Sequence, residues 1–343
     1  MTIGKSLPWI RFVLACLMAG LLAGAAEARS VDEVDLSGYW EPVLMEDYQS
    51  TYVGPDAVDF TGLPLNAAAR ARALSYSDGL LDMPERQCMY YGTDYLAIGP
   101  FGFRMTPESD PVSGDTVSWR ISPWIDRPEA RIWMDGRPHP GVDALHTVAG
   151  FTTGAWQGHT LTAQTTHLRE SPLRRNGVPR SDQASMTIHF SRHGDYLQLT
   201  AIITDPIYLT EPLVLSRLYR QNPTAYLKND MVYPCNSREQ SADARGVVPN
   251  YLPGKNPLET QFAQRYGLPL TAALGGAQTM YPEYRHALEG VYKRPDKMCD
   301  CYCCAWGDAR NPDYYNRYVA LKCPGLKRSS PEVIDLIGNG ATQ

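Results

Sequence analysis

The sequence predicts a mainly β protein whose strands form an antiparallel barrel, followed by a partly helical, cysteine-rich C-terminal appendix. Segments rich in Val, Ile, Thr and Trp recur between about residues 31 and 240, and Gly, Pro or Asp bound each of them. No helical crossovers separate these segments, which favours an antiparallel meander closed into a barrel or sandwich. After residue 241, Pro and Gly interrupt every possible element, and cysteines gather near the end of the chain.

The N-terminal residues have the pattern of an export signal. Lys5 and Arg11 precede an apolar run, Phe12 to Ala26, that ends in Ala26-Glu27-Ala28. This run is shorter than the roughly 20 residues that span a bilayer, so we expect cleavage after Ala28 rather than a retained anchor. The mature protein is then expected to be periplasmic or secreted, without stable membrane insertion.

The rest of the chain divides at about residue 240. We expect a signal peptide over 1–28, a β-barrel domain over 29–240 and a cysteine-rich appendix over 241–343. The formal net charge is -5, and the chain has no run of Lys and Arg. This charge gives no reason to expect a nucleic-acid partner, because phosphate binding depends on clustered basic side chains.

Within the barrel domain the strand pattern is clearest in one hairpin. Two alternating segments, Ala184–Arg192 and Tyr196–Thr204, meet at Gly194, which supplies the positive φ that a tight turn needs. The other predicted strands are Asp115–Trp124, Glu129–Pro140, His159–Leu168 and Leu213–Arg220. Helical character is expected at Pro64–Leu74, Pro257–Tyr266 and Tyr281–Val291.

The motif "DLSGYW", Asp35 to Trp40, resembles the glycine-x-tryptophan opening of lipocalin-like barrels. The resemblance implies that Trp40 closes one end of the barrel and that a late arginine, Arg217 or Arg220, packs over it through a cation-π contact. The same tryptophan could equally be a core aromatic residue of another β fold.

A second resemblance is to a broad group of exported, uncharacterised bacterial proteins. It depends on an ordered set of motifs: "DLSGYW", "ERQC" at 85–88, "MDGRPHP" at 134–140, "GAWQGHTL" at 154–161, "NGVPRSD" at 176–182 and "ITDPIYLTEP" at 203–212. The group implies the barrel and export, and it carries no assigned activity. This chain departs from it, since Ser185 and Ile188 stand where relatives have histidine and glutamate.

Candidate catalytic residues lie in "MDGRPHP". Asp135, Arg137 and His139 occupy alternate positions, which share one face of an extended segment. Asp135 and His139 could then act as an acid-base pair. The alternative is a surface turn in which Asp135 caps backbone amides and pairs with Arg137.

Two functions remain open, and the sequence favours the first. The first is a barrel that binds a small hydrophobic molecule, with candidate binding residues Trp40, Trp133, Arg137, Trp156 and His167. The second is a cofactor-independent acid-base enzyme, such as a hydratase, isomerase, cyclase or hydrolase, that uses the same cavity. The phosphate-loop, G-x-G-x-x-G, G-x-S-x-G and H-E-x-x-H motifs are absent, so an enzyme here would need a less stereotyped acid-base site. We expect no cofactor.

The cysteines are interpreted mainly as structural. Export favours disulfides over thiolate metal sites, and we expect Cys88 to pair with Cys235 and Cys323 to pair back to the "CDCYCC" segment at 299–304. Zinc bound by this cluster and redox chemistry remain alternatives. The mature chain keeps an odd number of cysteines, so a fully oxidised monomer leaves at least one thiol free.

Overall fold

The computed structural model describes residues 33–43, 55–77, 92–99, 102–123, 129–224 and 249–293. The proposed signal segment and all the cysteines lie outside these residues, so the cleavage site, the disulfides and the zinc alternative stay predictions.

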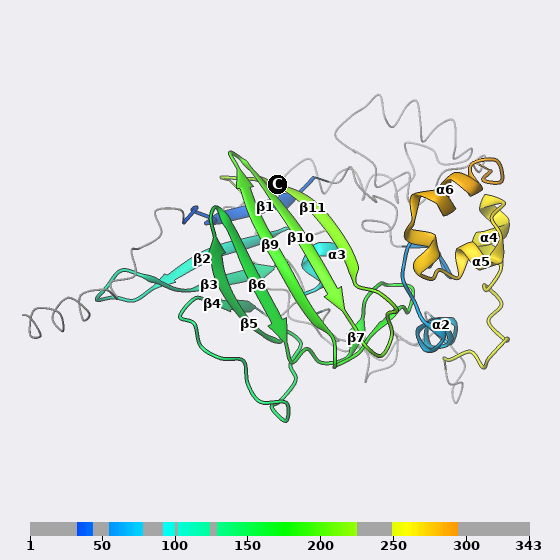
Figure 1. Ribbon diagram of the computed structural model, residues 1–343, viewed down its shortest axis with the longest axis horizontal. Helices are drawn as coiled ribbons and strands as arrows, with labels where there is room; N and C mark the ends of the chain where they lie inside the picture. Colours follow the sequence, from blue (N-terminus) through cyan, green and yellow to red (C-terminus); the bar gives the residue numbers. More distant parts are fainter. Residues whose placement is uncertain are drawn as a thin grey trace, which may run out of the picture.

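The described strands form a closed barrel in the order β1-β11-β10-β9-β6-β5-β4-β3-β2, which confirms the mainly β prediction (Figure 1). The barrel strands are β1 Gly38–Pro42, β2 Phe103–Ser109, β3 Thr116–Pro123, β4 Ala130–Trp133, β5 Phe151–Gln157, β6 Thr160–Thr166, β9 Ser185–His193, β10 Tyr196–Thr204 and β11 Leu213–Gln221. A separate pair, β7 Ser171–Pro172 and β8 Pro179–Arg180, lies outside the barrel sheet.

The prediction of a purely antiparallel barrel is wrong at one place, because β4 and β5 pair in parallel. Parallel neighbours cannot be joined by a tight turn, and the chain needs a crossover to return to the start of the next strand. Residues 134–150 make this crossover without a helix, and we call them the strap. The strand expected over Glu129–Pro140 therefore ends at Trp133.

Other strands confirm or extend the sequence prediction. The hairpin of β9 and β10 pairs Tyr196 with His193, and Gly194 in the turn has a φ of 61°. Strand β2 was not predicted, because Pro107 lies inside it. That proline is tolerated because β1 pairs only with residues 103–105 of β2, so no partner strand needs its missing N–H on that side.

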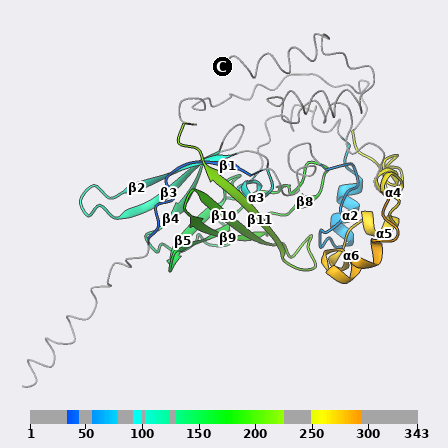
Figure 2. The same cartoon turned by 90° about the horizontal axis from the view of Figure 1, so that it is seen from above.

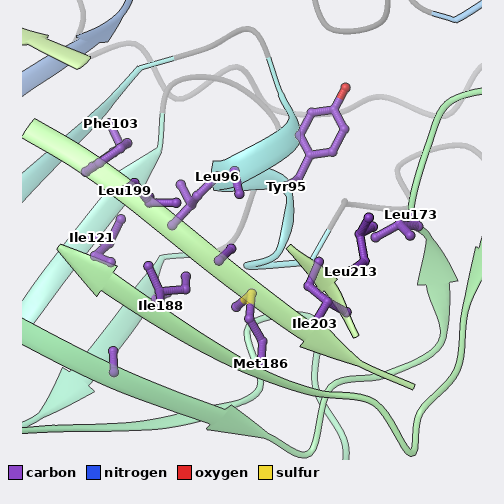
Figure 3. Close-up of a cluster of buried hydrophobic side chains, with 14 of the residues drawn as sticks. Tyr95, Leu96, Phe103, Ile121, Leu173, Met186, Ile188, Leu199, Ile203 and Leu213 are labelled. Atoms are coloured by element: carbon purple, nitrogen blue, oxygen red, sulfur yellow. The ribbon is translucent and has the colours of Figure 1, made fainter. Parts of the chain in front are cut away.

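Apolar side chains and one short helix pack in the barrel interior. Helix α3, Tyr95–Ile98, lies against β10 and β11, and Figure 3 shows Leu96 close to Leu199 and Ile188. The hydroxyl of Tyr219 donates a hydrogen bond to the backbone oxygen of Leu96. The helix is thus part of the core rather than a cover over its outside.

Trp40 on β1 is fully buried. Its indole Nε1 donates to the backbone oxygen of Leu36 at 2.9 Å. The guanidinium of Arg192 lies 5.4 Å from the ring centroid of Trp40, so the arginine near this ring comes from β9. Arg217 is instead buried in the interior and Arg220 is exposed on β11.

The helices outside the barrel gather in one unit, seen to one side of the strands in Figures 1 and 2. They are α2 Ala67–Leu74, α4 Gln261–Tyr266, α5 Leu270–Ala273, the 3-10 helix η4 Ala277–Met280 and α6 Pro282–Leu288. Backbone hydrogen bonds join Phe60 N to Ala273 O at 2.9 Å and Gly276 N to Leu63 O at 2.8 Å. The described part of the appendix therefore packs on residues that precede β2.

Each of the three segments expected to be helical contains a helix, although each helix is shorter than predicted. The helices α2 and α4 begin later than predicted, at Ala67 and Gln261, and α6 ends earlier, at Leu288. Gly267, in the left-handed conformation, ends α4 after Tyr266, as predicted. In the described part of the chain, no helix has both the length and the apolar character needed to cross a membrane.

Candidate functional site

The strap lies against the outside of the barrel, and the strand register shows why. Inward-facing Ile132 and Leu161 are buried, so their neighbours in the alternating pattern face outward. Trp133 pairs with Ser118 on one side and with Thr153 on the other, and all three share the outer face. The segment that continues from Trp133 therefore places its polar side chains outside the interior.

Asp135 and Arg137 form a local turn at the beginning of the strap. Arg137 donates from Nε to Asp135 Oδ1 at 2.8 Å, and its backbone N–H reaches the same oxygen at 3.3 Å. Gly136 between them has a φ of 71°, as this turn requires. The hydrogen bond from Arg137 lowers the pKa of Asp135, and the same bond raises the pKa of Arg137. This geometry matches the turn that the sequence offered as an alternative.

The guanidinium groups of Arg131 and Arg137 lie near the outward-facing ring of Trp133. The Cζ atom of Arg137 lies 3.5 Å from the ring centroid, and that of Arg131 lies 5.0 Å away. Arg131 in turn contacts Glu108 on β2 at 3.0 Å. Trp133, Arg137 and Asp135 are thus brought together as a surface cluster, with each charge paired.

Two histidines meet at one hydroxyl group further along the strap. The Nδ1 atoms of His139 and His167 each lie 2.7 Å from Oγ1 of Thr166. The Nε2 atom of His139 lies 2.8 Å from Oγ1 of Thr153, and that of His167 lies 2.9 Å from the backbone oxygen of Gly141. His167 has a φ of 56°, an uncommon value that turns its side chain back toward the strap.

These contacts determine the direction of the hydrogen bonds when both rings are neutral. The oxygen of Gly141 can only accept, so His167 carries its proton on Nε2 and accepts from Thr166 at Nδ1. Thr166 has then used its one proton, so His139 must donate from Nδ1 to the Thr166 oxygen. The Nε2 atom of His139 is left to accept from Thr153. We call this sequence of contacts the histidine chain.

The surroundings of His139 favour its neutral form. Burial lowers the pKa of His139, and the neighbouring His167 lowers it further. His146 adds a third ring, 5.1 Å from that of His167, and its Nδ1 donates to the backbone oxygen of Leu168 at 3.1 Å. Three histidines therefore hold both ends of the strap to the barrel.

Sequence reasoning did not identify Thr153 and Thr166, which carry the contacts of His139. Their outward position on neighbouring strands β5 and β6 could have been found only from the register of that hairpin, in which Thr153 pairs with Gln164. Within the described residues no group of three or more His, Cys, Asp or Glu side chains is arranged to hold a metal ion.

The remaining predicted binding residues, Trp40 and Trp156, face the barrel interior. Trp156 pairs with inward-facing Leu161 and packs against the core. Its indole Nε1 is buried and has no hydrogen-bond partner in the described part of the chain. The same holds for Nε1 of Trp119, which is only 4% exposed and was not among the predicted binding residues. Two donors without acceptors are unusual in an interior where buried polar groups are normally paired.

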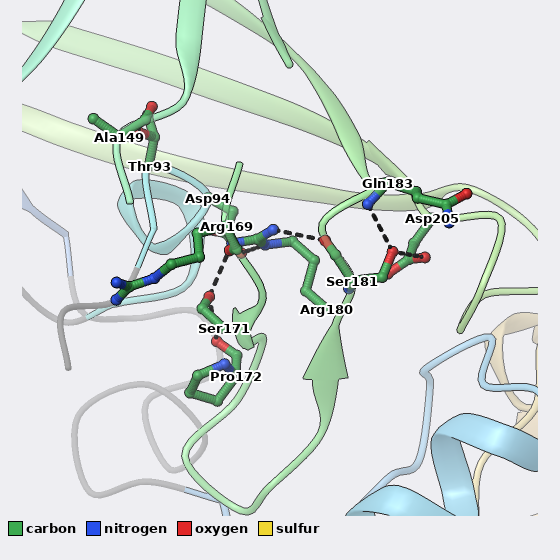
Figure 4. A network of polar contacts seen from close by, with 10 residues as sticks. All are labelled: Thr93, Asp94, Ala149, Arg169, Ser171, Pro172, Arg180, Ser181, Gln183 and Asp205. Carbon is green, nitrogen blue, oxygen red and sulfur yellow. Dashed lines mark hydrogen bonds and ion pairs between the residues drawn. The ribbon is translucent and has the colours of Figure 1, made fainter. Parts of the chain in front are cut away.

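A buried polar network lies beside the start of β9 and the end of β10 (Figure 4). Arg180 contacts Asp94 at 2.9 Å, and both side chains are at most 2% exposed. The Nη1 atom of Arg180 donates to the backbone oxygen of Ser181 at 2.9 Å, and the hydroxyl of Ser181 donates to Asp205 at 2.7 Å. Asp205 also accepts from the backbone N–H groups of Ile207 and Tyr208, so it is a turn residue directly after β10.

This network joins two of the motifs in the resemblance to exported bacterial proteins, "NGVPRSD" and "ITDPIYLTEP". Each motif supplies one side of the contact between Ser181 and Asp205, and the backbone N–H of Ser181 also donates to Asp205, at 2.7 Å. The motifs thus have a structural explanation in this contact.

Comparisons with known proteins do not assign the chain to a family. No protein-family model and no curated protein matches it. One similar solved structure is secretory abundant heat soluble protein 4 from Ramazzottius varieornatus, with 14% sequence identity and a TM-score of 0.25 over 54% of this chain and 94% of that chain. A likeness at this level carries no argument about function. The resemblance to exported bacterial proteins stays a prediction.

Proposed function

We propose that this protein binds a small, mainly hydrophobic molecule inside its barrel. The observation that carries the proposal is the pair of unpartnered indole donors, Trp119 Nε1 and Trp156 Nε1, in an interior that is mainly apolar apart from Arg217 and the paired hydroxyls of Thr152 and Thr165. A buried donor without an acceptor costs about 1–3 kcal/mol, which a ligand with one or two acceptor oxygens would recover. The ligand is therefore expected to combine an apolar body with a carbonyl, carboxyl or hydroxyl group.

Native mass spectrometry of the purified protein tests this proposal, together with a titration by decanoic acid followed by tryptophan fluorescence. We expect Trp156→Phe and Trp119→Phe to weaken decanoic acid binding by about 2- to 10-fold each, the cost of one hydrogen bond. Trp133→Phe is the matched control, because Trp133 lies on the outer face. Absence of both a retained mass and decanoic acid binding would refute the proposal.

A second candidate, acid-base catalysis, is favoured by the contact of 2.8 Å between Thr153 Oγ1 and His139 Nε2. A hydroxyl next to a neutral imidazole whose other nitrogen is held in place is the arrangement of an activated nucleophile and its base. Hydrolysis of 4-nitrophenyl acetate would test it, with His139→Gln compared to a control at exposed His159. Equal rates for the two variants would exclude this candidate.

Export is the remaining part of the proposal. The supporting pattern is the basic and apolar N-terminal segment that ends at Ala28. N-terminal sequencing of protein recovered outside the cytoplasm should begin at Arg29. Protein that retains Met1 would contradict it.

A further inference from the structure

The outer face of the barrel has one half on which Arg220, next to the end of β11, is the one charged strand residue. On β6, β9, β10 and β11, alternation with the buried positions leaves uncharged residues facing outward, and we call these the uncharged wall: Thr160, Thr162, Gln164, Ser185, Thr187, His189, Ser191, Gln198, Thr200, Ile202, Thr204, Val214, Ser216 and Leu218. Every one of these residues is exposed or half-buried. The four strands lie side by side in Figure 1.

The other half of the barrel has the opposite character. Outward positions on β1, β2, β3 and β4 include Glu41, Arg104, Glu108, Arg120 and Arg131. Charged residues make up 20% of the chain, so their scarcity on the outer face of β6, β9, β10 and β11 is a feature of the fold rather than of the composition. Arg220 is the one charged outward residue of β11, and it lies next to the end of that strand.

The side chains of the uncharged wall suit a partner surface that is also uncharged and carries both hydroxyl and apolar groups. Hydroxyl groups both donate and accept, as shown by contacts within the wall between Thr160 and Ser191 at 2.9 Å and between Thr162 and His189 at 3.0 Å. Neighbouring Ile202 and Val214 add an apolar area, and Val214 is 58% exposed. A charged partner would lose hydration here without finding an opposite charge, which is costly.

We infer that the uncharged wall is the contact surface for a second copy of this chain. In a twofold dimer the same surface packs on itself, so no carboxylate or guanidinium would be buried between the copies. Depletion of charge at the centre of a surface patch is the compositional mark of protein-protein interfaces. The charges of the protein would then stay on the rim and on the opposite side of each barrel.

The size of the wall indicates a weak dimer. Four strands spaced about 4.8 Å apart, with about seven residues rising about 3.3 Å each, give roughly 450 Å² per copy. Two copies would bury on the order of 900 Å², which belongs to transient rather than obligate interfaces. Association should therefore depend on concentration and appear only in the upper micromolar range.

Sedimentation velocity of the protein from about 10 µM to about 1 mM tests the inference at concentrations where weak interfaces associate. We expect the average mass to rise toward that of a dimer. Thr200, which pairs with His189 and Ser216, lies in the middle of the wall. Thr200→Glu would bring two carboxylates together and should weaken association by at least about 10-fold, as like charges at an interface do. An equimolar mixture of Thr200→Glu and Thr200→Lys should restore it.

Thr106→Glu, on the outer face of β2, is the matched control and should associate as the unmodified protein does. If Thr200→Glu fails to fold, Gln198→Glu at an exposed position of the same strand replaces it. A protein that stays monomeric at about 1 mM overturns the inference, since even transient interfaces associate there. So does an equal effect of the changes at Thr200 and Thr106. Association does not depend on a ligand, so its failure leaves the proposed binding function untouched.

Discussion

The protein contains two arginine-carboxylate pairs that have the same chemistry and different surroundings. Arg180 and Asp94 are at most 2% exposed, whereas the side chains of Arg137 and Asp135 are 36% and 34% exposed. The buried pair is joined to Ser171 and to the backbone of Arg169 and Ser181, and the exposed pair is confined to one turn. We therefore expect burial, rather than the presence of an ion pair, to decide how strongly the fold depends on each pair.

The largest effect is expected from breaking the buried pair. Asp94→Ala would leave the Arg180 guanidinium buried without its carboxylate and should lower the free energy of unfolding by about 3–5 kcal/mol. Urea denaturation followed by circular dichroism measures this loss. Replacing both partners, with Asp94→Leu and Arg180→Met together, should recover much of it, because no unpaired charge then remains. A double variant as unstable as the single one would contradict this account.

A smaller loss is expected at Asp205, which extends the buried network without an ion pair of its own. It accepts from Ser181 N and Oγ and from the backbone N–H groups of Ile207 and Tyr208. Asp205→Ala leaves these donors without their acceptor and should cost about 1–3 kcal/mol in urea denaturation. Exposed Asp182 is the matched control, and Asp182→Ala should change little. Equal losses at the two positions would show that the buried hydrogen bonds of Asp205 add no stability beyond that of an exposed aspartate.

The same comparison explains what the sequence could predict. Asp135 and Arg137 are two residues apart, so their pairing follows from the turn chemistry of Asp-Gly. Asp94 and Arg180 are 86 residues apart, and only the closure of the barrel brings them together. Contacts between residues close in the sequence can be predicted from the sequence. Contacts that depend on how distant strands pair cannot.

The fold was predictable to a similar extent. The alternating pattern identified β9 and β10 because most of their inward residues are apolar and most of their outward residues are polar, with Arg192 and Ile202 as exceptions. Helix α3 was missed because it has only four residues, too few for a periodic pattern. The outward location of His139 could not be predicted either. It follows from the parallel pairing of β4 and β5, and no local sequence pattern indicates that pairing.

A still smaller effect is expected from acid, and it involves the histidine chain at the strap. The pKa of His139 is lowered by burial and by His167, so the folded protein takes up this proton less readily than the unfolded chain, whose histidine titrates near 6.5. The stability contribution is therefore complete above pH 6.5 and is lost as the pH falls through the lowered pKa. Urea midpoints at pH 8 and pH 5 should differ less in His139→Gln than in the unmodified protein. A variant at exposed His159 should keep the full difference.

The smallest effect is expected at the exposed pair, and it completes the comparison. Arg137→Gln removes the guanidinium from a pair that water can reach, so water can hydrate the remaining Asp135 carboxylate. The urea midpoint should therefore stay within the scatter of replicate measurements. The guanidinium lies 3.5 Å from the centroid of Trp133, so the same variant should still change the tryptophan emission. A spectral change without a stability change would show that the contact exists and contributes little. A loss as large as that of Asp94→Ala would instead mean that the strap depends on this turn, and the difference between the two pairs could no longer be attributed to burial.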